Sequence, residues 1–216
     1  MPVKPLGFHP DQHPQQLIDC RRCPLWEGAT QPVPGSGPRR ARLMVVGEQP
    51  GDQEDLQGKA FVGPAGALLD NALIEARIDR KQVYITNAVK HFKWEPHGKR
   101  RMHKMPAQRE VDACHYWIER ELAMHEPEIV IALGATALKS ILQDSTAKLQ
   151  ASMDQVIEHD GRRIIATFHP SYALRAPDAG TRQSAYQAIV DAFRRAQRLI
   201  HDKQGPTTHG QTMVKG

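Results

Sequence analysis

The chain has 216 residues, of which 40% are apolar and 25% are charged, and its formal net charge at pH 7 is +5. This length and composition predict one compact domain, without an apolar run long enough to span a bilayer. The basic excess permits an anionic partner such as nucleic acid, although charge alone identifies none. The ends are polar and weakly periodic. We therefore expect a flexible N-terminal segment (residues 1–15), one domain (residues 16–202) and a flexible C-terminal tail (residues 203–216).

Strands and helices alternate along the expected domain. Four short apolar runs predict buried strands at residues 43–46, 83–87, 129–134 and 163–168. Apolar residues at helical spacing predict helices at residues 66–76, 108–125 and 182–201 and one that starts at residue 135. Residues 91–106, crowded with Lys and Arg, are expected to form a long polar loop. The alternation predicts an α/β fold of three αβα layers around a central, mostly parallel four-stranded sheet.

Polar residues follow the predicted strands at their carboxyl ends, where ligands of such sheets bind. Glu48 and Gln49 come after the first strand, Asn87 ends the second and His169 follows the fourth. The Asn87 amide carries both a donor and an acceptor, which suits the edge of a base. His169 is a candidate donor to developing negative charge, although a lone histidine there is more often an ordinary hydrogen-bonded side chain.

Two turns near this edge carry further candidates. Residues 47–52 form a Gly- and Pro-rich turn that adds the carboxylate of Asp52. Residues 61–66 offer the Phe61 ring and a helix start whose free N–H groups favour anions. Both turns could simply connect strands to helices, and Phe61 could be a core residue.

A basic cluster, Lys99-Arg100-Arg101, stands two residues before His103. A run of this kind is usually a solvated loop. The functional interpretation is a phosphate-contacting loop that also carries a nucleophile or an acid/base group.

The chain has three cysteines, Cys20, Cys23 and Cys114, and His91 stands where a fourth ligand would be unsurprising. Three cysteines cannot all pair as disulfides, and the N-terminus does not resemble a secretory signal. We therefore expect a reducing compartment and metal or redox chemistry at the Cys-x-x-Cys pair. The alternatives left open are ordinary thiols and a zinc site with the same ligands.

Residues 47–51, 61–63, 87–90 and 169–171 resemble motifs of the iron–sulfur uracil-DNA glycosylases of family 4. The chain is more similar to their DNA-crosslinking branch, called UdgX, and the resemblance runs from about Cys20 to the closing helix. Two departures from the ordinary family pattern carry that assignment. His91 replaces a cysteine ligand, and residues 99–103 read Lys-Arg-Arg-Met-His where the branch has Lys-Arg-Arg-Ile-His.

The resemblance implies excision of uracil from single-stranded or duplex DNA, followed by attachment of the abasic sugar to a histidine. It implies a [4Fe–4S] cluster held by Cys20, Cys23, His91 and Cys114. The implied catalytic residues are His103, Glu48, His169 and Asp52, with either Glu48 or Asp52 activating His103. The implied uracil-binding residues are Gln49, Phe61, Asn87 and His169. The implied DNA-binding residues are Lys99, Arg100, Arg101, Ser171 and Arg175.

Two other functions remain open at this stage. One is a conventional, multiple-turnover family-4 glycosylase in which water captures the sugar and His103 merely contacts DNA. The other is a noncatalytic iron–sulfur protein that binds nucleic acid or senses redox state. For the leading hypothesis we expect a bacterial, cytoplasmic, nucleoid-associated monomer without a membrane partner.

Overall fold

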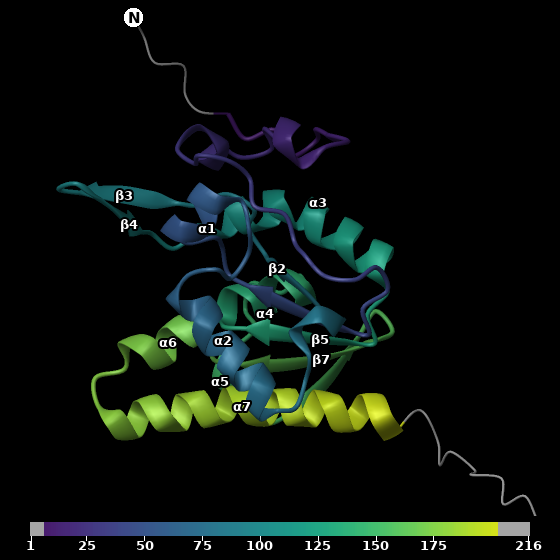
Figure 1. Ribbon diagram of the computed structural model, residues 1–216. Coiled ribbons are helices and arrows are strands. Elements are labelled where there is room, and N and C mark those ends of the chain that lie inside the picture. Colours follow the sequence, from purple (N-terminus) through teal and green to yellow (C-terminus); the bar gives the residue numbers. More distant parts are fainter. Residues whose placement is uncertain (1–6, 203–216) are drawn as a thin grey trace, which may run out of the picture.

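The computed structural model describes residues 7–202 (Figure 1). Its strands are β1 (Leu43–Gly47), β2 (Val83–Asn87), β3 (Trp94–His97), β4 (Arg100–His103), β5 (Ile129–Leu133), β6 (Val156–His159) and β7 (Arg162–Thr167). Its α-helices are α1 (Asp52–Gln57), α2 (Pro64–Glu75), α3 (Gln108–His125), α4 (Ala135–Leu142), α5 (Leu149–Ser152), α6 (Pro170–Arg175) and α7 (Ala179–Asp202). Three short 3₁₀ helices are η1 (Leu17–Asp19), η2 (Pro24–Glu27) and η3 (Arg80–Gln82).

The central sheet has the strand order β2-β1-β5-β7-β6. The first four of these strands are mutually parallel and correspond to the four predicted ones, so the predicted α/β fold class is confirmed. The fifth, β6, was not predicted and pairs antiparallel with β7 at the sheet edge. Its sequence, Val-Ile-Glu-His, has two charged or polar residues in four and lacks the continuous apolar run of a buried strand.

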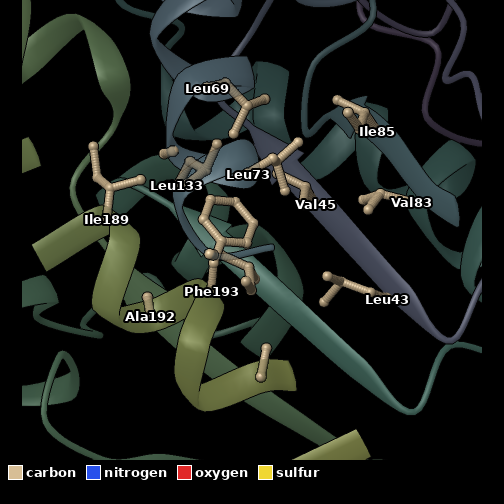
Figure 2. Packing of buried hydrophobic residues seen from close by; sticks show 14 of the residues in the cluster. Leu43, Val45, Leu69, Leu73, Val83, Ile85, Leu133, Ile189, Ala192 and Phe193 are labelled. Atoms are coloured by element: carbon tan, nitrogen blue, oxygen red, sulfur yellow. The ribbon is translucent and has the colours of Figure 1, made fainter. Parts of the chain in front are cut away.

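Helices cover both faces of the sheet because successive strand residues point in opposite directions. Leu43 and Val45 of β1 pack with α2 and α7, whereas Met44 and Val46 pack with α3 and α4. Figure 2 shows the first of these layers, where Phe193 of α7 lies among side chains of α2 and β1. Burying each such side chain contributes roughly 1.5–3 kcal/mol.

The expectation of a polar loop over residues 91–106 is wrong. This segment contains an antiparallel hairpin, β3–β4, which extends away from the body of the molecule (Figure 1). Gly98, with φ at +60°, opens its two-residue turn, a conformation that costs glycine little. Its flanking residues are largely charged and exposed, so they lack the apolar alternation by which strands are recognised. The hairpin pairs Trp94 with His103 at its base.

The predicted flexible ends fall partly outside the described residues. Of the N-terminal segment, residues 7–15 are described, and they contact α3. The Tyr116 hydroxyl donates to the Pro14 carbonyl over 3.1 Å, and Phe8 packs against the cluster of buried residues that includes Trp117. Residues 1–6 and the tail at 203–216 lie outside the described part, so their flexibility stays a prediction.

Within residues 7–202, no helix combines the length and apolarity needed to cross a bilayer.

Candidate active site

A small cavity of about 140 Å³ opens at the carboxyl ends of β1, β2 and β7. It is smaller than the roughly 300–1,000 Å³ of pockets for drug-sized ligands, so it suits one small ring. Its lining contains eight of the twelve catalytic, uracil-binding and DNA-binding residues that the sequence predicted, from five separate segments of the chain. The lining residues are Glu48, Gln49, Gly51, Glu54, Phe61, Ala65, Asn87, His103, His169, Ser171, Tyr172 and Arg175.

Glu48 joins the hairpin to the sheet. Its Oε1 lies 3.3 Å from Nε2 of His103, and its Oε2 accepts a 2.7 Å hydrogen bond from the Thr136 hydroxyl at the start of α4. Burial raises the pKa of Glu48, but the hydrogen bonds from His103 and Thr136 outweigh it and leave the pKa below its usual value. A carboxylate therefore faces His103, whose side chain is 45% exposed and open to a ligand.

His169 is a neutral hydrogen-bond donor. Burial lowers its pKa from 6.5 to about 4. Its Nδ1 accepts a 3.2 Å hydrogen bond from the Ser171 backbone N–H at the start of α6, so the ring proton is carried by Nε2. Because the ring lines the cavity, an N–H group is available there without a charge that would bind anions indiscriminately.

Asn87 and Phe61 form a tight polar and aromatic pair around Gly47. Asn87 is 2% exposed, and its Oδ1 has no hydrogen-bond partner among the described residues. Phe61 is 5% exposed, and its ring centroid lies 5.9 Å from that of His169. Phe61 has a left-handed φ of 55°, which costs a non-glycine residue roughly 1–2 kcal/mol. A buried, unpaired oxygen beside a ring is an arrangement that a planar polar ligand would satisfy.

Gln49 fastens the base of the hairpin. Its Nε2 donates to the carbonyls of Lys93 and Lys104, each over 3.1 Å, and its Oε1 accepts from the Lys93 N–H over 3.2 Å. The side-chain amide therefore binds the main chain just before β3 and just after β4. These contacts fix the base of the hairpin, where His103 lies. Its predicted contact with uracil stays a prediction.

Arg101 ties the hairpin to α1. Its Nε donates to Asp52 Oδ1 over 2.7 Å, and its Nη1 donates to the fully buried Asp55 over 2.6 Å. Asp52 is not among the described residues that line the cavity. It lies instead in the contact of Arg101 with Asp52 and Asp55, which we call the hairpin anchor, and not beside the predicted catalytic groups. Arg101, predicted to bind DNA, has a guanidinium already engaged by two carboxylates.

The other predicted DNA contacts lie on two elements, the hairpin and α6. Lys99 and Arg100 are exposed at the tip of the hairpin, whereas Ser171 and Arg175 line the cavity from α6. Arg175 therefore brings a positive charge to the cavity, whereas Lys99 and Arg100 carry theirs at the far end of the hairpin whose base includes His103.

Sequence reasoning missed Glu54 and Thr136. Glu54 is 8% exposed, and its carboxylate accepts hydrogen bonds from the N–H groups of Gly51, Val62 and Gly63, which holds together the two turns that carry the site. A glutamate three residues after Gly51 at a helix start was the available signal. Thr136 gave no local signal, because its partner Glu48 is distant in sequence.

The three cysteines are buried together. Cys20, Cys23 and Cys114 belong to one cluster of buried residues, with Trp117 and Val89. Cys20 Sγ accepts a 3.3 Å hydrogen bond from the Trp117 indole, and Cys114 Sγ accepts a 3.2 Å one from the Lys90 backbone N–H. Burial raises the pKa of Cys23 to about 11 and also raises that of Cys114.

His91 follows Lys90 directly and is 3% exposed. Burial, together with the nearby charge of Arg21 between Cys20 and Cys23 in the sequence, lowers its pKa to about 4. Within residues 7–202, no three His, Cys, Asp or Glu side chains converge so as to hold a single metal ion. The region therefore contains all four predicted ligands but not the compact geometry of a one-ion site.

The sequence of the chain is similar to those of known proteins. The family model described as "Uracil DNA glycosylase superfamily" matches residues 34–194, from before β1 to near the end of α7. The chain belongs to the uracil-DNA glycosylase superfamily. It is 38% identical over 162 residues to a type-4 uracil-DNA glycosylase from Thermotoga maritima, covering 74% of this chain and 81% of the relative.

Two further glycosylases of the superfamily extend this comparison. A type-4 enzyme from Sulfurisphaera tokodaii is 35% identical over 173 residues, which is 76% of this chain and 75% of the relative. A type-5 uracil-DNA glycosylase from Pyrobaculum aerophilum is 29% identical over 224 residues, which is 89% of this chain and 93% of the relative. The predicted family is thereby confirmed at the level of the uracil-DNA glycosylase superfamily, and the crosslinking branch stays a prediction.

Proposed function

We propose that this glycosylase removes uracil from DNA and then becomes covalently attached to the abasic sugar through His103. The observation that carries the proposal is the contact between His103 and Glu48, 3.3 Å apart, in the cavity that also contains Asn87 and His169. The pair supplies a nucleophile with its own proton acceptor beside groups suited to bind and release a base.

Asn87 and Phe61 are proposed to recognise uracil. The unpaired Oδ1 of Asn87 would accept from N3–H of the base, and the amide N–H₂ would donate to O4. Cytosine has an acceptor at N3 and a donor at the next position, so both contacts would fail. Leaving buried polar groups unpaired costs about 1–3 kcal/mol, which supports discrimination against cytosine. The target nucleotide must leave the base stack to enter the cavity.

His169 is proposed to assist the departure of the base. As the bond between N1 and C1′ breaks, its electron pair goes to uracil and positive charge develops on the sugar. The neutral His169, with its proton on Nε2, would donate a hydrogen bond to the uracil O2, where the negative charge develops.

His103 is proposed to capture the sugar. One ring nitrogen holds the proton that faces Glu48, and the other donates its lone pair to C1′. The new N–C1′ bond replaces the broken N1–C1′ bond, and the proton released from the imidazolium passes to Glu48. Asp52, which is occupied by Arg101, is proposed to fix the hairpin.

DNA is proposed to bind across the opening of the cavity. Lys99 and Arg100 at the hairpin tip and Arg175 on α6 would contact phosphates on either side of the uracil. Each phosphate contact releases a counterion, so the affinity would fall steeply with salt concentration.

The residues Cys20, Cys23, His91 and Cys114 are proposed to hold a [4Fe–4S] cluster. Their chemistry fits, because thiolates and imidazole ligate iron, and because N–H groups of Lys90 and Trp117 already donate to two of the sulfur atoms. Each ligand of such a cluster binds a different iron atom, so the side chains need not converge on one point, in agreement with the absence of a one-ion site among residues 7–202. When bound, the cluster would cross-link the N-terminal segment, the loop after β2 and α3.

Incubation with uracil-containing single-stranded DNA tests the covalent step. We expect a band on a denaturing gel that migrates slowly and resists heat and detergent. His103→Ser should abolish this band and release uracil over several turnovers. His97→Ser, the same substitution at an exposed histidine of the same hairpin, is the control and should keep the band. A His103→Ser protein that still forms the adduct would exclude His103 as the nucleophile.

The identity to type-4 enzymes favours a second candidate function, conventional hydrolysis with multiple turnovers. Glu48 would then orient a water molecule, and His103 would contact DNA. Free uracil and abasic DNA without an adduct in the wild-type reaction would support this second function.

A further inference from the structure

Lys90 is buried completely, and its amino group has three partners. The residue is 0% exposed, and Nζ donates to Glu121 Oε2 over 2.7 Å, to the Thr86 hydroxyl over 2.6 Å and to the Asn87 carbonyl over 2.8 Å. All three donor hydrogens of the group are therefore used. A buried ion pair of this kind is costly to desolvate and is weak evidence for stability alone.

One of these partners belongs to the residue proposed to recognise uracil. The side-chain Oδ1 of Asn87 has no hydrogen-bond partner among the described residues. Packing, and no hydrogen bond, therefore holds this oxygen in place. Asn87 is also the last residue of β2, paired with Gly47, and the chain leaves the sheet after it. The direction of its amide thus depends on the position of its main chain, and Lys90 holds the carbonyl of that main chain.

The other contacts of Lys90 lead to α3. Glu121, which binds Nζ, and Cys114, whose Sγ accepts from the Lys90 backbone N–H over 3.2 Å, are two helical turns apart on one side of α3. Lys90 therefore attaches the end of β2 to α3 at two points, one ion pair and one hydrogen bond to sulfur.

We propose that Lys90 is a positioning residue for base recognition: it holds Asn87 against α3, so that the affinity for uracil depends on this anchor. The proposal rests on the proposed recognition of uracil by Asn87. Lys90 touches neither the base nor the sugar, and it acts through the main chain of Asn87.

Lys93 provides a matched control. Its Nζ donates to Glu110 Oε2 over 2.7 Å, so it also joins the segment after β2 to α3 by a partly buried ion pair. Among the described residues it has no contact with Asn87. A loss of general stability would follow from either substitution, whereas a loss of base recognition should follow from Lys90→Met only.

The experiment measures affinity for two single-stranded DNAs. One contains a 2′-fluorinated deoxyuridine, whose glycosidic bond resists cleavage, and the other has a tetrahydrofuran abasic analogue at the same position. The ratio of the two dissociation constants reports recognition of the base alone. We expect Lys90→Met to lower the preference for the uracil probe about tenfold, the effect of one lost hydrogen bond, and to leave the abasic affinity within twofold. Lys93→Met should leave the ratio unchanged.

A second variant guards against misfolding. Lys90→Met leaves the carboxylate of Glu121 without its cation, which can destabilise the fold, and Lys90→Met/Glu121→Leu removes both charges. The double variant should show the same tenfold loss of preference. If the ratio for folded Lys90→Met or the double variant equals that of wild type or Lys93→Met, the positioning role is refuted. If the wild-type protein itself does not prefer the uracil probe, the proposed function fails first, and the two failures are therefore distinguishable.

Discussion

Gly47→Ala should close the cavity without changing any group that takes part in the chemistry. A Cβ at this position would lie 2.6 Å from Phe61 Cζ and closer still to Asn87 Oδ1. Real Cβ atoms do not approach neighbours this closely, so either the Phe61 ring or the Asn87 amide must move. Both side chains are buried, and Phe61 already has a strained backbone, so neither side chain can move without further unfavourable contacts.

The size of the effect follows from these contacts. Relieving an overpacked contact in a buried site costs typically about 1–3 kcal/mol, and a displaced amide loses at least one hydrogen bond to the base, worth about 1 kcal/mol. The two costs are alternatives, because a complex that restores the native geometry pays the first and one that leaves the amide displaced pays the second, so the barrier to base release should rise by roughly 1–3 kcal/mol. Since each 1.36 kcal/mol is a factor of ten, we expect the rate to fall roughly 5- to 150-fold.

Single-turnover release of uracil from single-stranded DNA measures this loss, and circular dichroism checks that the variant is folded. Gly28→Ala is the control, because the nearest atom to a Cβ there is Trp94 Nε1 at 3.8 Å, an ordinary contact. A folded Gly47→Ala protein that releases uracil within threefold of the wild-type rate would refute the assignment of Asn87 and Phe61 as the walls of the uracil site.

Three further predictions concern the hairpin anchor, pH and the cysteines. Arg101→Met removes the cation that pairs with the buried Asp55, so it should destabilise the fold by about 2 kcal/mol and reduce the adduct yield. Thermal melting measures the first effect and the denaturing gel measures the second. An unchanged melting temperature and adduct yield would show that the contact of Arg101 with Asp55 does not position the hairpin. Burial lowers the pKa of His169 to about 4, so as the pH falls the unfolded chain binds a proton at this residue before the folded protein does. The free energy of unfolding should therefore fall by up to about 3 kcal/mol as the pH drops from about 7 to about 4. Urea titrations should show a flatter pH dependence for His169→Asn, and an equally steep one would contradict the neutral imidazole. Cys114→Ser should lose the brown colour and most of the bound iron and sulfide, whereas full retention of iron would exclude Cys114 as a ligand.

The fold was predictable because its core strands are continuous apolar runs. The predicted strand at residues 83–87 and the predicted helix at residues 108–125 agree with β2 and α3. The sequence did not predict β6 or the hairpin, because both lie at edges and consist largely of polar side chains whose pairing depends on distant residues. Gln49 illustrates the reason: its amide holds both strands of the hairpin, a contact across 44 and 55 residues that no local pattern encodes.

The candidate site was predictable at the ends of the parallel strands, where topology brings side chains together. Glu48, Asn87 and His169 line one cavity as expected. Asp52 and Arg101 could not be assigned from sequence, because a carboxylate and a guanidinium on neighbouring loops serve equally well as catalytic groups or as partners of each other. Their mutual ion pair depends on the antiparallel register of β4, which only the structure provides.

The hairpin is a separable unit of the protein. Among residues 7–202, β3 and β4 pair only with each other, and their attachment to the rest depends on a few side chains, chiefly Gln49 and Arg101. Such an insert can be transplanted together with its two fastening points. With the capture of the sugar that we propose for His103, a turnover glycosylase that received the hairpin, a glutamine at the first turn and carboxylates on the following helix would become a reagent that marks each uracil in a genome by staying there.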